Sequence, residues 1–290
     1  MKRSSRSGGV SVIELKNASF SYGAGSTVSD LSFTIGKGEF VAILGANGAG
    51  KTTTVKLIDG LLRPTSGSVL INGVDTASSR VSERARQIGF LFQNPDRQIC
   101  RNTVREEIAF GLEAVRQDLG PDGIRARVDQ VLQDFSFTGD EEPFSLSRGQ
   151  RQRVALASVL AVQPEAVILD EPTTGLDYRE CCHIMDIICR MNQEAGMTVV
   201  MVCHDMEVVL DYARRALVIS EGRLVADGPI PDLFRDPALL ARASVLPPQI
   251  IGLSLRLGGE FASVTTAEEA AAVALRLRGR RSSASGEVSV

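Results

Sequence analysis

Residues 45–52, GANGAGKT, place glycines, a lysine and a threonine in the pattern G-x-x-x-x-G-K-S/T. Glycines let such a loop wrap around phosphates with several N–H groups pointing inward, and the N-terminus of the following helix adds positive potential. In this pattern Lys51 reaches the β- and γ-phosphates of ATP, and the hydroxyl of Thr52 binds Mg²⁺. The residues expected around the nucleotide are those of the loop and helix start: Gly45, Asn47, Gly48, Gly50, Lys51, Thr52 and Thr53.

A second group of chemically capable residues follows the apolar run at 166–169, in the stretch AVILDEP. Asp170, at the end of the expected strand, is placed to bind Mg²⁺, and Glu171 to orient or deprotonate a water molecule. Two adjacent acids at a strand end repel each other unless a cation or a proton lies between them. Downstream of a phosphate loop, this pair indicates hydrolysis of ATP.

Three further residues suit an ATP site less specifically. Gln93, which ends the stretch IGFLFQ, can reach Mg²⁺ or the attacking water. His204, which follows the apolar stretch MTVVMVC, can donate to an oxygen of the γ-phosphate, although a histidine at a strand end often has a structural role. Tyr22 offers a ring on which adenine can stack, or it packs against its neighbours. The candidate catalytic residues are Lys51, Gln93, Glu171 and His204, and the candidate metal ligands are Thr52, Gln93 and Asp170.

The stretch FSLSRGQRQR at 144–153 resembles the start of a helix that holds an anion. It combines a serine, a glycine and three arginines, and an apolar helical run follows it. Free backbone N–H groups and a hydroxyl at a helix start favour negative charge. The residue types alone do not say which anion is bound, or on which chain it lies.

The elements expected to position these residues alternate between strands and helices. Short apolar runs predict strands at 12–20, 30–35, 39–45, 68–73, 88–92, 166–170 and 197–203. Helices between them indicate an α/β fold with a parallel sheet covered on both faces. Residues 103–135 carry helical spacing without a strand, which predicts a helical insert. A hairpin is expected to turn at Glu221 and Gly222.

Composition narrows the class of protein. The chain has 290 residues, 43% of them hydrophobic, and a formal net charge of −3, which argues against a nucleic-acid partner. No run reaches the roughly 18 consecutive apolar residues of a membrane-spanning helix. The five cysteines form no C-x-x-C pair, which favours reduced thiols over disulfides or a zinc site. The N-terminus lacks the apolar core of a secretory signal.

The expected domain organisation has four parts. Residues 1–11 form a disordered N-terminus, and 12–233 an ATPase domain whose helical part covers about 94–150. Residues 234–279 form a C-terminal accessory region, in which Thr266 and Glu269 fit a capping box. Residues 280–290 are expected to be a disordered tail.

Over about residues 13–233 the chain resembles the nucleotide-binding subunit of ABC transporters. Tyr22 stands at the A-loop position, GANGAGKT is the Walker A motif, and Gln93 is the Q-loop glutamine. LSRGQ at 146–150 is the signature, AVILDEP the Walker B motif, TTGLD the D-loop, and His204 the switch histidine. The resemblance implies a P-loop ATPase core with an N-terminal antiparallel β subdomain, a helical signature subdomain and a small C-terminal extension.

The resemblance also implies whose anion the signature binds. In ABC ATPases two chains sandwich two ATP molecules, and each signature contacts the γ-phosphate held by the other chain. Ser147, Gly149 and Gln150 are therefore expected to bind the ATP of a second ATPase subunit, in a homodimer or a heterodimer. The common signature is LSGGQ, and this chain has Arg148 in place of its first glycine. Arg148 either points to solvent or tunes hydrolysis beside the partner's phosphate.

A finer resemblance follows Gln93. FQNPDRQ at 92–98 and TVREEIAFGLE at 103–113 are similar to the ATPase of energy-coupling factor (ECF) transporters, as is the Pro-Pro-Gln stretch at 247–249. That group implies uptake of a vitamin or transition-metal ion through a membrane scaffold and a substrate-binding membrane subunit, with the ATPase at the cytoplasmic face. One alternative is an ATPase of another ABC importer or exporter. The other is an ABC ATPase acting on nucleic acid, disfavoured because 94 residues between Thr52 and Ser147 are too few for a long coiled coil.

Overall fold

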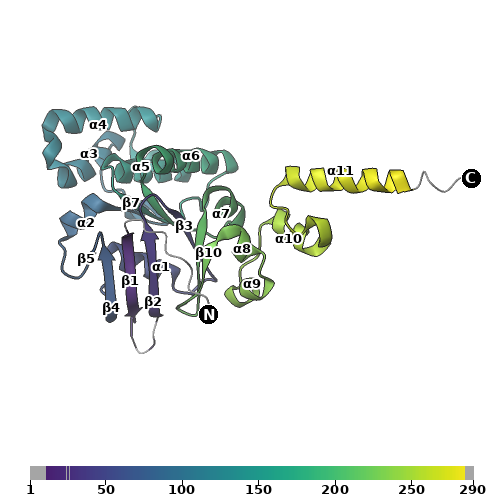
Figure 1. The fold of residues 1–290 in the computed structure, drawn as a ribbon. Helices are drawn as coiled ribbons and strands as arrows, with labels where there is room; N and C mark the ends of the chain where they lie inside the picture. Colours follow the sequence, from purple (N-terminus) through teal and green to yellow (C-terminus); the bar gives the residue numbers. More distant parts are fainter. Residues whose placement is uncertain (1–10, 24, 26, 285–290) are drawn as a thin grey trace, which may run out of the picture.

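The computed structural model describes residues 11–23, 25 and 27–284. The disorder expected at 1–10 and at 285–290 lies outside the described residues. The described chain forms two β-sheets with helices packed around them (Figure 1).

The larger sheet carries the strands that end in candidate site residues. Its order is β10-β9-β3-β8-β7-β6, with β9, β3, β8, β7 and β6 parallel and β10 antiparallel at one edge. Its strands are β3 Phe40–Leu44, β6 Ile88–Leu91, β7 Ala166–Asp170, β8 Thr198–Val202, β9 Arg215–Ser220 and β10 Arg223–Pro229. Every residue of β3, β7 and β8 is buried, which explains why these strands are nearly continuous apolar runs.

The smaller sheet is antiparallel, with the order β2-β1-β4-β5. Its strands are β1 Ser11–Phe20, β2 Val28–Gly36, β4 Ser66–Ile71 and β5 Val74–Asp75. Helix α1 (Lys51–Asp59) shares one hydrophobic cluster with strands of both sheets, because Val55 and Ile58 pack in the same core as Ile13 and Ile43. The helix that follows the phosphate loop is thus fixed between two sheets.

A second hydrophobic cluster covers the other face of the parallel sheet. It contains residues of the helical insert and of the helices that follow it. The helices up to Tyr212 are α2 Val81–Gln87, α3 Val104–Val115, α4 Gly120–Asp134, α5 Arg148–Ala161, α6 Tyr178–Ala195 and α7 Met206–Tyr212. Short 3₁₀ turns lie at η1 Pro95–Arg97, η2 Gln117–Leu119 and η3 Pro143–Ser145. The α/β prediction, the helical insert and the hairpin at Glu221-Gly222 are confirmed.

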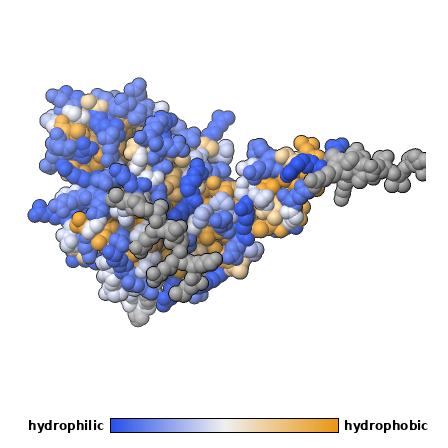
Figure 2. All heavy atoms as spheres, in the orientation of Figure 1, coloured by the Kyte–Doolittle hydropathy of each residue, from blue (hydrophilic) through white to orange (hydrophobic). Residues whose placement is uncertain are grey.

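The C-terminal region is helical and ends away from the sheets (Figure 1). Its elements are α8 Ile230–Phe234, α9 Pro237–Ala243, α10 Gln249–Leu257, η4 Gly259–Phe261 and α11 Ala267–Ala284. Figure 2 shows apolar residues gathered over this region on the visible face. Leu253 and Leu257 of α10 are exposed.

Two predicted boundaries need correction. The capping box is present, since the Thr266 hydroxyl accepts from the Glu269 N–H at 3.2 Å and the Glu269 carboxylate accepts from the Thr266 N–H. The helix that it starts continues to Ala284, so a disordered tail beginning at 280 is wrong for 280–284. Arginine is a good helix former and favours the last turns of a helix, which explains the extension. At the other end β1 already includes Ser11, so the disorder expected for 1–11 is wrong for this residue.

Among the described helices, none is long and apolar enough to cross a membrane.

Candidate functional site

The loop at residues 45–50 connects β3 to α1 through glycines that no other residue could replace without strain. Gly45 has φ +148° and Gly50 has φ +104°. A side chain on Gly45 would collide with the carbonyl oxygen of Ile219, and one on Gly50 would approach Val28 Cγ1 to 2.7 Å. The conformation of the loop therefore depends on glycine at both positions.

Helix α1 begins without a side-chain cap. Its N-cap is Gly50, and no side chain accepts a hydrogen bond from the first N–H groups. These groups carry the positive end of the helix dipole and are suited to bind phosphate. Lys51 is buried beside them, and its Nζ donates to the carbonyl oxygens of Gly45 and Ala46, each at 2.9 Å. Burial lowers the pKa of Lys51, and the negative charges of Glu171 and Asp170 oppose that shift.

Thr52 and Asp170 meet although 118 residues separate them in the chain. The Thr52 hydroxyl lies 3.5 Å from Asp170 Oδ1, at the end of β7. Asp170 is buried, and burial together with the charge of Glu171 raises its pKa. A carboxylate that is buried beside another acid is stabilised by a cation, which is what Mg²⁺ would provide.

The chemistry of the donor set agrees with Mg²⁺. Hydroxyl and carboxylate oxygens are the ligands that this ion prefers, and it keeps several waters and substrate oxygens in its shell. Within the described part of the chain, no group of three or more His, Cys, Asp or Glu side chains could hold a metal ion by itself. Thr52 and Asp170 thus suit an ion that ATP phosphates and water also coordinate. Gln93 makes its recorded side-chain hydrogen bond to Glu171 and none to Thr52 or Asp170.

The carboxylate of Glu171 is the centre of a polar cluster. Oε2 accepts from Gln93 Nε2 at 2.7 Å and from the Thr174 hydroxyl at 3.0 Å, and Oε1 lies 2.9 Å from His204 Nε2. Strand order explains this arrangement, because Gln93 follows β6, Glu171 follows β7 and His204 follows β8, and these three strands are adjacent. Glu171 itself adopts a left-handed backbone conformation with φ +54°. Thr174 was not among the predicted site residues.

The remaining residues predicted to contact the nucleotide differ in their exposure to solvent. Tyr22 is 63% exposed and packs edge-to-face on Phe20, with 4.8 Å between ring centroids. Its ring therefore has an open face for a base to stack on. Asn47 and Gly48 are exposed at the tip of the loop, whereas Thr53 is buried.

The signature lies at the start of α5. Ser147 is the N-cap of this helix, its hydroxyl accepts from the Gln150 N–H at 3.2 Å, and Gln150 Oε1 accepts from the Ser147 N–H at 2.9 Å. The described structure records no hydrogen bond or ion pair between residues 147–150 and residues 45–53. Among the described residues, the start of α5 thus makes no recorded polar contact with the loop at the start of α1.

Arg148 and Gly149 face the segment that follows Glu171. Gly149 lies so close to the Glu180 carboxylate that a side chain at this position would require Glu180 to move. The guanidinium of Arg148 is exposed and lies over Gly175, with Nε 3.1 Å from the position of a Cβ atom on that glycine. Arg148 thus lies against Gly175 in the loop at 173–177 of its own chain, although its side chain is exposed to solvent.

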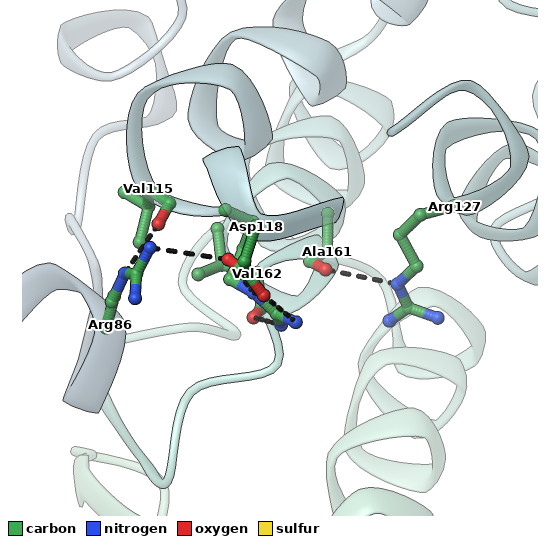
Figure 3. Close-up of polar contacts among 7 residues, drawn as sticks. Arg86, Val115, Asp118, Arg127, Ala161 and Val162 are labelled. Atoms are coloured by element: carbon green, nitrogen blue, oxygen red, sulfur yellow. Dashed lines mark hydrogen bonds and ion pairs between the residues drawn. The ribbon is translucent and has the colours of Figure 1, made fainter. Parts of the chain in front are cut away.

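Arginines from the helical insert bind the C-terminal end of α5 (Figure 3). Arg127 of α4 donates to the carbonyl oxygens of Ala161 at 3.1 Å and Leu160 at 3.3 Å, and Arg116 donates to that of Val162 at 3.1 Å. These carbonyl groups lie at the negative end of the helix dipole, where positive charge is favourable.

The same cluster ties the insert to α2. Arg116 also binds Asp118, and Arg86 of α2 donates to the Val115 carbonyl oxygen at 2.7 Å and to Asp118 at 3.3 Å. Figure 3 shows these contacts side by side with that between Arg127 and Ala161. Two arginines therefore bind the C-terminal end of α5 directly, and Asp118 links one of them, Arg116, to Arg86 of α2.

The segment after Gln93 is attached to the N-terminal half of α5. Asp96 Oδ1 accepts from Arg151 Nε at 2.7 Å, and Arg151 also donates to the Leu146 carbonyl oxygen. Gln98 joins Phe92 to α5, because its Oε1 accepts from the Phe92 N–H and its Nε2 donates to the Ala155 carbonyl oxygen. The segment after Gln93 is therefore joined to α5 by direct contacts.

Comparison with known proteins identifies the kind of site. A family model described as ABC transporter matches residues 28–174. A protein of Caldanaerobacter subterraneus named as an ABC transporter ATP-binding protein is 42% identical over 87% of the chain. One of Methanosarcina acetivorans with the same kind of name is 37% identical over 94% of the chain and 85% of its own length. The chain spans 44% of the length of the Caldanaerobacter relative, and 43% of that of a Vibrio vulnificus relative.

Two solved structures show the same fold. The cbiO1 protein of Clostridium perfringens, part of the ABC transporter complex cbiONQ, is 32% identical and aligns over 88% of this chain and 99% of its own, with a TM-score of 0.71. The ATP-binding cassette MJ0796, as a dimer after hydrolysis with ADP and Pi bound, is 30% identical and aligns over 75% of this chain and 98% of its own, with a TM-score of 0.69. The predicted fold class is confirmed.

Proposed function

Because the chain belongs to the ABC transporter family of ATP-binding proteins, we propose that it is the ATPase subunit of an ECF-type uptake transporter. The cassette is an ATPase of the ABC type. The observation that carries the assignment of its catalytic residues is the cluster of Gln93, Thr174 and His204 around the Glu171 carboxylate. The cargo is a micronutrient, either a vitamin or a transition-metal ion.

In this proposal each polar group of the site has one task. The N–H groups at the start of α1 and the Nζ of Lys51 bind the phosphates and stabilise the charge that develops during in-line transfer. Glu171 polarises the attacking water and accepts its proton, while Gln93 and Thr174 hold the carboxylate in place through Oε2. His204 donates to an oxygen of the γ-phosphate. Thr52 and Asp170 would hold Mg²⁺, which would supply positive charge beside the phosphates.

The site is completed by a second ATPase subunit. Ser147, Gly149 and Gln150 lie away from the phosphate loop of their own chain, so they are available to a nucleotide held by a partner. Two chains then enclose two ATP molecules. Closure follows ATP binding, and hydrolysis leaves ADP and phosphate, whose like charges favour reopening. Arg148, resting on Gly175, would couple the signature to the loop that follows Glu171.

The ECF assignment and the membrane partners have support from sequence and from one structural relative. The cbiO1 protein, which is part of an ABC transporter complex, aligns over 88% of this chain. The segment at 92–98 resembles the ECF ATPases, and its contacts with α5 suit it to pass movement to a membrane scaffold subunit. The chain then works as a peripheral protein at the cytoplasmic face, beside a scaffold and a substrate-binding membrane subunit.

The proposal is tested with the variant Glu171→Gln, which keeps the shape of the side chain and removes its negative charge. We expect ATP binding to persist and turnover to fall by about 100-fold or more, because the water loses its base. Glu194→Gln, on the exposed end of α6, is the matched control and should hydrolyse ATP like the wild type. Wild-type turnover of Glu171→Gln would remove Glu171 as the base.

The partners are tested with the same variant. The tagged chain is captured from membranes solubilised in the presence of ATP, and the bound proteins are identified. A second ATPase with a membrane scaffold and a small integral binding protein would support the ECF assignment. A conventional permease would contradict the ECF type and leave the ABC transporter assignment standing. Recovery without any membrane protein would contradict a transport role.

A further inference from the structure

A cavity of about 570 Å³ lies beside the Glu171–His204 pair, and part of its wall comes from far along the chain. Glu171, Thr174 and His204 line it on one side. Leu246, Pro247 and Pro248, from the link between α9 and α10, line it on another side. The C-terminal region thus contributes to the pocket that holds the proposed catalytic pair.

The link is attached to the turn that carries His204. The N–H of Gln249, the first residue of α10, donates to Glu207 Oε1 at 2.7 Å. Glu207 lies in the first turn of α7, where its own N–H donates to the N-cap Asp205 at 2.9 Å. Since Asp205 follows His204 directly, a single turn of chain carries both the histidine and the carboxylate that holds α10.

Hydrophobic packing reinforces this attachment. Ile251 of α10 is fully buried and belongs to the same cluster as Val208 and Val209 of α7. Farther along α10, Leu253 and Leu257 are about half exposed, whereas Ser254 is buried. The start of α10 is therefore attached to α7 through the bond from Gln249 to Glu207, and both helices contribute to one hydrophobic cluster.

We propose that Glu207 is a positioning residue for ATP hydrolysis. By accepting the N–H of Gln249 it holds the wall at 246–248 against the pocket and fixes the turn that presents His204 to Glu171. The accessory region then sets the turnover of the catalytic pair without touching the nucleotide. The inference rests on the proposed roles of Glu171 and His204, and it makes the C-terminal extension a control element for hydrolysis within the same chain.

The bond can be removed from its donor side with little other change. Gln249→Pro removes the N–H, and proline is favoured at the first position of a helix, where the extended conformation of Pro248 (φ −50°, ψ 150°) already suits a following proline. Gln249→Ala is the matched control, because it removes the side chain and keeps the N–H. On the acceptor side Glu207→Ala removes the bond, and Glu207→Gln retains an oxygen that can accept it.

Steady-state kinetics of ATP hydrolysis separate positioning from stability. For Gln249→Pro and Glu207→Ala we expect kcat to fall by about 3- to 10-fold with KM for ATP changed by less than about 2-fold, because the pair that acts in the transition state is misplaced. Gln249→Ala and Glu207→Gln should stay close to the wild type. The double variant Glu207→Ala/Gln249→Pro should lose no more than either single variant, since both remove the same bond.

A charge control lies on the same helix. Asp211→Ala removes a carboxylate one turn after Glu207, where the side chain is exposed, and should leave kcat unchanged. The inference is overturned if Gln249→Pro and Glu207→Ala lower the melting temperature while kcat stays at the wild-type value. It is also overturned if losses in the double variant add. In either case, loss of turnover in Glu171→Gln would leave the proposed function standing.

Discussion

Helices α1 and α5 both begin with an expected anion-binding site, and they are built in opposite ways. Helix α1 starts at Gly50 with no side-chain cap, so its first N–H groups are left for a ligand. Helix α5 starts at Ser147 with a complete capping box, in which Ser147 and Gln150 satisfy each other's N–H groups. The first helix start is made for a ligand of its own chain, and the second is already stable without one.

The opposite ends of the two helices differ as well. Helix α5 ends in carbonyl groups that accept from Arg116 and Arg127, so positive charge faces its negative end. Helix α1 ends in Asp59, and burial raises the pKa of this carboxyl group to about 6. The comparison teaches that α1 is held by packing and leaves its first N–H groups available to bind phosphate. Helix α5 is instead held by hydrogen bonds at both ends, and Ser147 is exposed at its start.

The largest effect should come from Lys51→Met, which removes the only lysine of the phosphate loop at 45–52. We expect hydrolysis to fall by about 100-fold or more, because a preorganised positive group near the γ-phosphate is lost. Nucleotide affinity of the isolated chain, measured by titration with a fluorescent ATP analogue, should fall too. Unchanged affinity and turnover would contradict the assignment of the loop.

Ser147→Ala should have a smaller effect and of a different kind. The isolated chain should bind the ATP analogue like the wild type, because Ser147 makes no recorded hydrogen bond to its own phosphate loop. ATP-dependent dimerisation of the Glu171→Gln background, measured by light scattering, should weaken by about 10-fold, since a donor to the partner's phosphate and an N-cap are both lost. A fall in the affinity of the isolated chain would erase the contrast between the two helices.

Arg127→Met should reduce stability by about 2 kcal/mol, because two carbonyl oxygens at the end of α5 lose a charged donor. The free energy of unfolding is measured by urea denaturation. Arg125→Met is the control, since Arg125 lies on the same helix and makes its recorded ion pair with the exposed Asp122. Equal losses of unfolding free energy for the two variants would show that the contacts at the C-terminal end of α5 do not stabilise the fold more than a surface ion pair does.

Asp59→Asn should raise the free energy of unfolding by about 1 to 2 kcal/mol at pH 7.5, and a pKa raised from 3.8 to about 6 sets an upper bound near 3 kcal/mol. The folded chain binds the Asp59 proton more tightly than the unfolded chain, so this contribution to stability grows as pH falls from about 7 to about 4. The gain from the variant should therefore vanish near pH 4. A gain that is independent of pH would exclude the buried carboxylate as its cause.

Much of the fold follows from local patterns that the sequence displays. The buried strands β3, β7 and β8 are apolar throughout, the glycines at 45–50 mark the loop, and Glu221-Gly222 marks the hairpin. In each case neighbouring residues determine the structure, so spacing and type are enough. The meeting of Gln93, Glu171 and His204 needed the family resemblance, because their adjacency depends on the strand order β8-β7-β6.

Other parts of the site leave no pattern in the sequence. Thr174 is one of several threonines, and its contact with Glu171 depends on the turn made by the left-handed Glu171. Arg127 and Arg116 resemble solvated helix residues, and their partners are backbone carbonyl groups of another helix. The bond from Gln249 to Glu207 links residues 42 positions apart. Such contacts arise from tertiary packing, which residue type does not encode.

The strand order of the larger sheet also sets the sequence of events during synthesis. Strands β1, β2, β4 and β5 all lie before residue 76, so the antiparallel sheet can form early. Among the described residues, strand β3 pairs with β8 and β9, which begin at Thr198 and Arg215. At ordinary rates of translation β3 waits roughly 10 to 30 s for its neighbours. The phosphate loop therefore leaves the ribosome well before the strands that flank β3 and acquires its final shape only after they have been made.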